Sequence, residues 1–116
     1  MVHRRRLSQS GERTFISCLI PKGVSHVHTV VSSTFRDEDL LLKSLFISSS
    51  ICFDFFVKSI GKGDFTTGNM KDLPIITDDF ILKSAFPRLL SLNCITSEYE
   101  ELWNDVYSLD FISNFW

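Results

Sequence analysis

The chain has 116 residues, of which 44% are hydrophobic and eleven are Phe, and its formal net charge is −2. This length suits a single domain, and this composition excludes a disordered chain. Residues 1–62 carry nine Lys and Arg against five Asp and Glu, whereas residues 63–116 carry three against nine. A basic first half and an acidic second half indicate two different surfaces, one of them suited to an anionic partner. If the charge asymmetry is the only evidence considered, two surfaces that simply face solvent are a simpler interpretation than a surface for an anionic partner.

The first twelve residues, MVHRRRLSQSGE, are basic but lack the apolar run of a signal peptide. We expect them to form a flexible basic tail. Cys18, Cys52 and Cys94 lie far apart and form no C-x-x-C pair, so neither a zinc finger nor a disulfide framework is indicated. Buried, reduced thiols in a cytoplasmic protein are the plain interpretation.

The segment that comes nearest to a membrane span is residues 40–57. Lys43, Asp54 and three consecutive serines interrupt it, and charged groups within a span are costly. We therefore expect no association with a membrane.

Two runs near the amino terminus, residues 14–20 and 24–31, are rich in β-branched residues and predict strands. Pro-Lys-Gly at 21–23 supplies a turn between them, so we expect the two strands to pair. Apolar residues then recur at helical spacing and predict one long central helix over about residues 36–60. Gly61 is expected to end this helix.

Residues 73–76 contain Leu-Pro and predict a short extended piece. Two carboxy-terminal helices follow, over about residues 79–95 and 97–108, and Pro87 is expected to break the first of them. The predicted fold class is α+β: a small β-sheet packs on the long central helix, with the helical pair behind.

Between the long helix and the extended piece lies GKGDFTTGNMK, a polar loop with three glycines. It lacks the G-x-x-x-x-G-K-[ST] spacing of a phosphate-binding loop, and no strand-then-helix pattern brackets it. Its glycines need another explanation.

Four segments in order resemble the carboxy-terminal, sequence-reading region of large adenine-specific DNA methyltransferases: ERTFI, IPKGVSHVHTV, SSSICFDFFVKSIGKGDFTTGNMKDLPI and LLSLNCITSEYEELWNDVY. Those enzymes belong to restriction-modification and phage-defence systems, and some also carry an endonuclease. The order of helix, glycine loop and Leu-Pro is also similar to the target-recognition domains of type I specificity subunits. The similarity runs from about residue 5 to residue 107.

This resemblance implies that the polar loop lies against double-stranded DNA. Glycines would let the backbone approach phosphates, lysines would supply charge, and Thr or Asn side chains would bond phosphates or base edges. The expected DNA-binding residues are Arg13, Lys22, His28, Lys58, Lys62, Thr66, Thr67, Asn69 and Lys71. A surface connection with solvated lysines is the alternative interpretation of the loop.

Two features of the catalytic domain of such enzymes are missing from this sequence. It has no glycine-rich S-adenosylmethionine loop and no Asn/Asp-Pro-Pro-aromatic motif for a flipped adenine. His26, His28 and Cys18 are better read as ordinary strand residues than as a metal site. We therefore expect residues 1–116 to be a single, non-catalytic domain without a cofactor or metal of its own.

The same resemblance implies that the chain is a fragment or subunit of a larger enzyme, or a truncated gene product. S-adenosylmethionine would be bound by the catalytic methyltransferase domain or subunit, which is the expected partner. The isolated chain is expected to self-associate through the surfaces that this partner would cover. The competing interpretation is a docking module whose acidic helices contact the catalytic partner while the chain reads no DNA.

Overall fold

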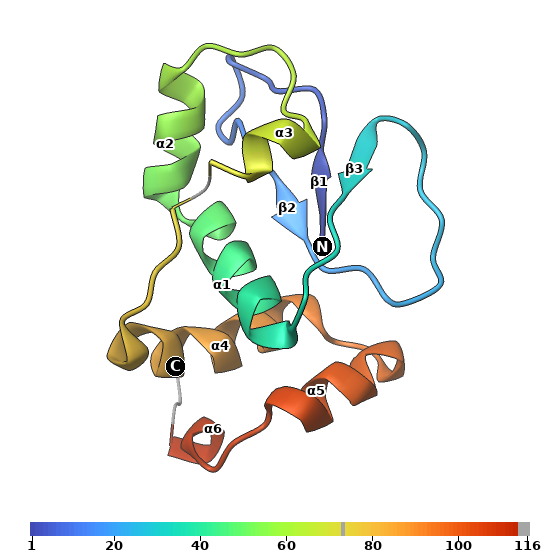
Figure 1. Ribbon diagram of the computed structural model, residues 1–116, viewed down its shortest axis with the longest axis vertical. Helices are drawn as coiled ribbons and strands as arrows, with labels where there is room; N and C mark the ends of the chain where they lie inside the picture. Colours follow the sequence, from blue (N-terminus) through green and yellow to red (C-terminus); the bar gives the residue numbers. More distant parts are fainter. Residues whose placement is uncertain (73, 114–116) are drawn as a thin grey trace.

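A computed structural model describes residues 1–72 and 74–113 (Figure 1). The fold class is α+β, as the sequence predicts. The strands are β1 (Val2–Arg4), β2 (Ser17–Cys18) and β3 (Val30–Ser32). The helices are α1 (Glu38–Ser49), α2 (Ile51–Ser59), α3 (Thr67–Met70), α4 (Asp79–Asn93), the 3-10 helix η1 (Ser97–Tyr99), α5 (Glu100–Val106) and α6 (Asp110–Ser113).

Helix α1 is the centre of the arrangement. In Figure 1, α2 lies above it, α4 and α5 lie below it, and the sheet stands beside it; α1 contacts all four of these neighbours. Two hydrophobic cores result, one on each side of α1. The lower core is built around Leu42, Leu45 and Leu90, and the upper core is built around Phe15, Phe53 and Phe65.

The amino terminus forms the middle of the sheet. The strand order is β2-β1-β3, and β1 is antiparallel to both neighbours, with Val2 opposite Cys18 on one side and Ser32 on the other. Val2, His3 and Leu7 are buried. The expectation of a flexible basic tail is therefore wrong for residues 1–7, because their backbone supplies hydrogen bonds that both other strands need.

The two expected strands are shorter than predicted and do not pair with each other. Only residues 17–18 and 30–32 belong to the sheet, and β1 separates them. Residues 24–29 are exposed and irregular instead of extended. An alternating pattern forms a strand only where a neighbouring strand can pair with it. Here β1 lies beside β2, in the place that a hairpin partner from residues 24–29 would take.

The predicted long helix is two helices, which bend by 68° where they meet at Ser50. Ser50 has an extended backbone, and its side chain accepts a hydrogen bond from Phe53 N at 3.1 Å as the N-cap of α2. Serine competes well for backbone groups at a helix start, so the break follows from the serine triplet in spite of the unbroken apolar spacing. Ser48 is buried there and bonds Ser17 of β2 through the two hydroxyls.

The carboxy-terminal helices lie close to their predicted positions. Asp78 caps α4 by accepting from Ile81 N at 3.0 Å. The helix continues through Pro87, so the expected break does not occur. The expected extended piece at 73–76 adds no strand: residue 73 lies outside the described residues, and 74–76 have no regular structure.

Of the three cysteines, only Cys94 is buried, and burial raises the pKa of its thiol to about 11. Cys18 and Cys52 are exposed, so the expectation of buried thiols is wrong for both. Within residues 1–72 and 74–113, no single helix is long and apolar enough to cross a membrane; α1 and α2 reach that length and composition only as a bent pair.

A buried carboxylate joins α2 to the segment that leads into β2. Oδ1 of Asp54 accepts hydrogen bonds from Thr14 N at 2.9 Å and Phe15 N at 2.7 Å, and Arg13 Nε lies 3.6 Å from the same oxygen. Asp54, Thr14 and Phe15 are all buried. Two backbone N–H groups therefore depend on one side chain, because no water can replace it there.

Asp54→Ala should lower the free energy of unfolding by about 3 kcal/mol, since a buried donor left without an acceptor costs about 1–3 kcal/mol. Asp54→Asn is the matched control, because it keeps an acceptor at Oδ1, and it should cost clearly less. Urea unfolding of both variants measures this. Equal losses would mean that charge, and not the hydrogen-bond acceptor, is what the site requires.

His3 should make the free energy of unfolding depend on pH. Its Nε2–H donates to Phe65 O at 3.1 Å, and its Nδ1 is buried without a partner. Desolvation lowers the pKa of His3 below its ordinary value of 6.5. The unfolded chain then binds more protons in this range, so the free energy of unfolding should fall as pH drops below about 7. His3→Gln should reduce that slope, which urea titrations at several pH values measure.

Candidate nucleic-acid interface

The 61–71 loop is fixed along the amino-terminal segment. Leu7 N donates to Gly63 O at 2.9 Å, Phe65 N donates to Arg5 O at 2.8 Å, and Arg6 pairs with Asp64 as an antiparallel bridge. Figure 1 shows the loop passing from the end of α2 across to β1. The loop thus prolongs the sheet locally and is not a free connection.

Phe65 anchors the loop. Its side chain is buried against the upper core, with its ring centroid 4.8 Å from that of Phe15 and 5.5 Å from that of His3. Phe53 of α2 lies 6.2 Å away, ring to ring. Sequence reasoning counted this residue as part of a polar loop and missed its structural role.

Two of the loop's glycines have different uses. Gly61 has φ +65°, the left-handed conformation that ends α2 and that other residues adopt at a cost. Around Gly63, a Cβ would meet no atom within 4 Å. The Cβ side of Gly63 is therefore open to solvent, while its carbonyl accepts from Leu7 N, so packing within the chain does not itself require a glycine there.

The polar residues beyond Phe65 are arranged by a capping box. Asn69 Oδ1 accepts from Thr66 N at 3.0 Å and from Thr66 Oγ1 at 3.1 Å, which starts the short helix α3. Thr67 begins this helix and Lys71 ends it, and all four side chains have solvent access. Within residues 1–72 and 74–113, no partner takes the donors of the Asn69 amide nitrogen or the Thr67 hydroxyl.

Basic side chains from three segments gather at the same end of the molecule. Lys58 Nζ donates to Gly11 O at 3.4 Å, Arg13 donates to Ser49 O at 3.1 Å, and Lys62 accepts from the Gln9 amide through its carbonyl oxygen. Among the described residues, neither Lys58 nor Lys62 forms an ion pair. Their charges therefore remain available to an external anion.

Sequence reasoning missed Arg5 and Arg6, because it placed them in a mobile tail. Together with His28, Thr29 and Asp64 they line an open hollow of about 300 Å³. Arg5 Nη1 lies 2.6 Å from His28 Nε2, and Arg5 Nε lies 3.4 Å from Asp64 Oδ2. The only signal for their position in the sequence is that Val2 and Leu7, which flank them, are apolar.

Lys22 does not join this surface. Its ammonium lies 2.6 Å from Glu101 Oε1 of α5, beside the lower core. Thus the expected residues of the loop, together with Arg13 and His28, belong to this surface. Lys22 lies apart from it. With Arg5, Arg6, Arg13 and several lysines, the gathered surface can donate hydrogen bonds to phosphate oxygens.

No cluster of three or more His, Cys, Asp or Glu suited to a metal ion occurs within the described part of the chain. No family model, curated protein or solved structure matches this sequence.

Proposed function

We propose that the chain is a DNA target-recognition module, non-catalytic by itself, that serves an adenine-specific DNA methyltransferase or a combined restriction-modification enzyme in the cytoplasm. One observation carries the proposal: backbone hydrogen bonds and a bridge at Asp64 place the 61–71 loop beside basic side chains from two other segments, Arg5–Arg6 and Lys58. The ordered sequence resemblance supports the same function. S-adenosylmethionine would bind to the catalytic partner and not to this chain.

In this proposal, the charges and the short polar side chains have separate tasks. Lysines and arginines contact phosphates of double-stranded DNA and set its position. Thr66, Thr67 and Asn69 stand on the fixed turn of α3, so they can present donors to base edges at a defined place. A rigid support suits base reading, because a mobile loop would lose affinity in becoming ordered.

The docking interpretation stays as the second candidate, and a specific observation favours it. Acidic side chains crowd η1 and α5, with Glu98, Glu100, Glu101 and Asp105 close together in the chain. This surface would repel DNA and could contact a basic protein. DNA binding by the purified chain separates the two candidates.

Changing Lys58, Lys62 and Lys71 together to Ala should weaken binding to duplex DNA. The slope of log K against log salt should become shallower by about 0.9 for each phosphate that the variant no longer neutralises. Fluorescence anisotropy with a labelled duplex at several salt concentrations measures both effects. Lys22→Ala is a control for position: it removes one lysine, where the variant removes three, from the acidic side beside Glu101, and it should leave the slope unchanged. An unaltered slope in the triple variant would mean that the loop does not face DNA.

Self-association of the isolated chain is proposed through the outer face of α2. Ile51 and Phe55 are 78% and 71% exposed one turn apart, next to an apolar groove lined by Ile47, Cys52, Phe53, Phe56 and Pro74. Exposed apolar area of this kind favours association. Ile51→Ser with Phe55→Ser should shift sedimentation toward monomer, whereas Val27→Ser, an exposed residue on the far side of the sheet, should not. A wild-type chain that is monomeric at all concentrations would refute this proposal.

A further inference from the structure

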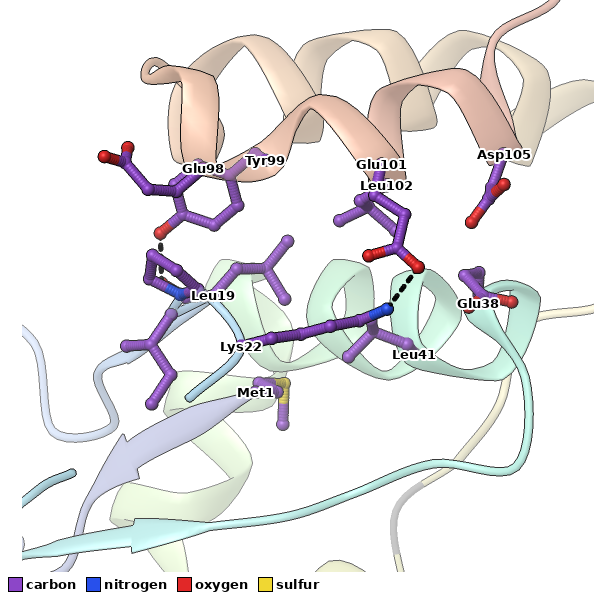
Figure 2. A pocket seen from close by; sticks show the side chains of 12 residues that line it. Met1, Leu19, Lys22, Glu38, Leu41, Glu98, Tyr99, Glu101, Leu102 and Asp105 are labelled. Atoms are coloured by element: carbon purple, nitrogen blue, oxygen red, sulfur yellow. Dashed lines mark hydrogen bonds and ion pairs between the residues drawn. The ribbon is translucent and has the colours of Figure 1, made fainter. Parts of the chain in front are cut away.

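A cavity of about 110 Å³ opens between η1 and α5 on one side and α1 on the other (Figure 2). Its floor and walls are apolar, with Leu19, Leu41 and Leu102 facing one another across it. Tyr99 closes one end and is held by a hydrogen bond from its hydroxyl to Leu19 O at 3.2 Å. This volume is well below the several hundred Å³ of pockets for drug-sized ligands, so it suits an unbranched chain of a few atoms.

Carboxylates surround the opening of this cavity. Glu38 comes from the start of α1, Glu101 and Asp105 come from α5, and Glu98 stands at the other end beside Tyr99 (Figure 2). Among the described residues that line the cavity, Lys22 is the one basic side chain. An apolar channel that ends among acids is complementary to an aliphatic cation and not to an anion or a neutral chain.

Lys22 already uses this complementarity within the molecule. Its side chain extends along the cavity toward α5, where the ammonium pairs with Glu101 at 2.6 Å (Figure 2). That hydrogen bond raises the pKa of Lys22, and the charges of Glu38 and Asp105 act in the same direction. The Lys22 side chain is nevertheless 80% exposed, so it covers the opening without being locked into a core.

We propose that this cavity is a docking site for a lysine side chain presented by a partner protein, and that the Lys22 ammonium, next to Glu101, occupies the position of that lysine's ammonium in the free chain. The four-carbon stem of the incoming lysine lies against Leu19, Leu41 and Leu102, as amphipathic side chains do along apolar surface. Its ammonium replaces that of Lys22 between Glu101, Glu38 and Asp105. Lysine is favoured over arginine, because a compact ammonium needs no planar space in so narrow a cavity.

Because Lys22 must leave the site before a partner lysine can bind, Lys22 weakens the affinity of the chain for the partner. A partner lysine gains only the difference between its own contacts and those that Lys22 gives up. If Lys22 occupies the site in roughly nine molecules of ten, the apparent Kd for the partner rises about tenfold. Removal of Lys22 should therefore tighten binding, which is the opposite of what a lysine that merely stabilises α5 would show.

The test uses the whole chain and the peptide acetyl-Gly-Lys-Gly-amide, with the methyl resonances of Leu19, Leu41 and Leu102 followed by NMR. The peptide should shift these methyls in Lys22→Ala with a Kd about tenfold lower than in the wild type. Lys22→Ala with Glu101→Gln should lose most of that binding. The methyl spectrum recorded before the peptide is added reports that each variant is folded.

Two control peptides decide the chemistry. The peptide acetylated on its lysine ammonium keeps the stem and loses the charge, and it should not bind; equal binding would make the cavity a plain apolar pocket and overturn the proposal. An arginine peptide that binds more tightly than the lysine peptide would also overturn it, as would no shift in Lys22→Ala. DNA binding by Lys22→Ala is measured in parallel and should be unchanged, so that failure here stays separate from failure of the proposed DNA function.

Discussion

The burial of Phe65 is the contact on which the upper half of the molecule depends. It inserts a loop residue among His3, Phe15 and Phe53, which come from β1, the segment before β2, and α2. The backbone of Gly63 and that of Phe65 itself then pair with Leu7 and Arg5. A glycine-containing connection becomes an ordered edge beside basic side chains, and burying a Phe side chain typically contributes about 1.5–3 kcal/mol to holding it there.

Helix α1 keeps two chemically different surfaces apart. One of its sides faces the upper core with the basic residues, and the other faces the lower core, which lies between α1 and the acidic α5 (Figure 1). The charge asymmetry of the two sequence halves becomes an asymmetry in space only in part: Lys22 and Glu38 of the first half lie at the acidic cavity, and Lys83 of the second half lines a hollow with Lys43. In the proposed function, DNA contacts the basic end and a partner protein contacts the acidic end, and neither surface covers the other.

The sequence predicts those features that depend on interactions within one helical turn, such as the ends of helices. Asp78 caps α4 and Gly61 ends α2 because both effects lie within one turn. The role of β1 could not be predicted, since nothing in Val-His-Arg identifies a central strand, and its partners lie 14 and 28 residues away. For the same reason, Arg5 and Arg6 were absent from the predicted site: their position follows from long-range pairing, whereas Lys58, Lys62 and Asn69 stand out by composition alone.

The proposed function requires duplex DNA to contact the basic end of the molecule. Amide resonances of the ¹⁵N-labelled chain, followed by NMR while a short duplex is added, report where on the chain contact occurs. We expect shifts to concentrate at Arg5, Arg6 and residues 62–71, with little change along α5. Shifts centred on α5, or none anywhere at low salt, would show that the basic end does not bind DNA.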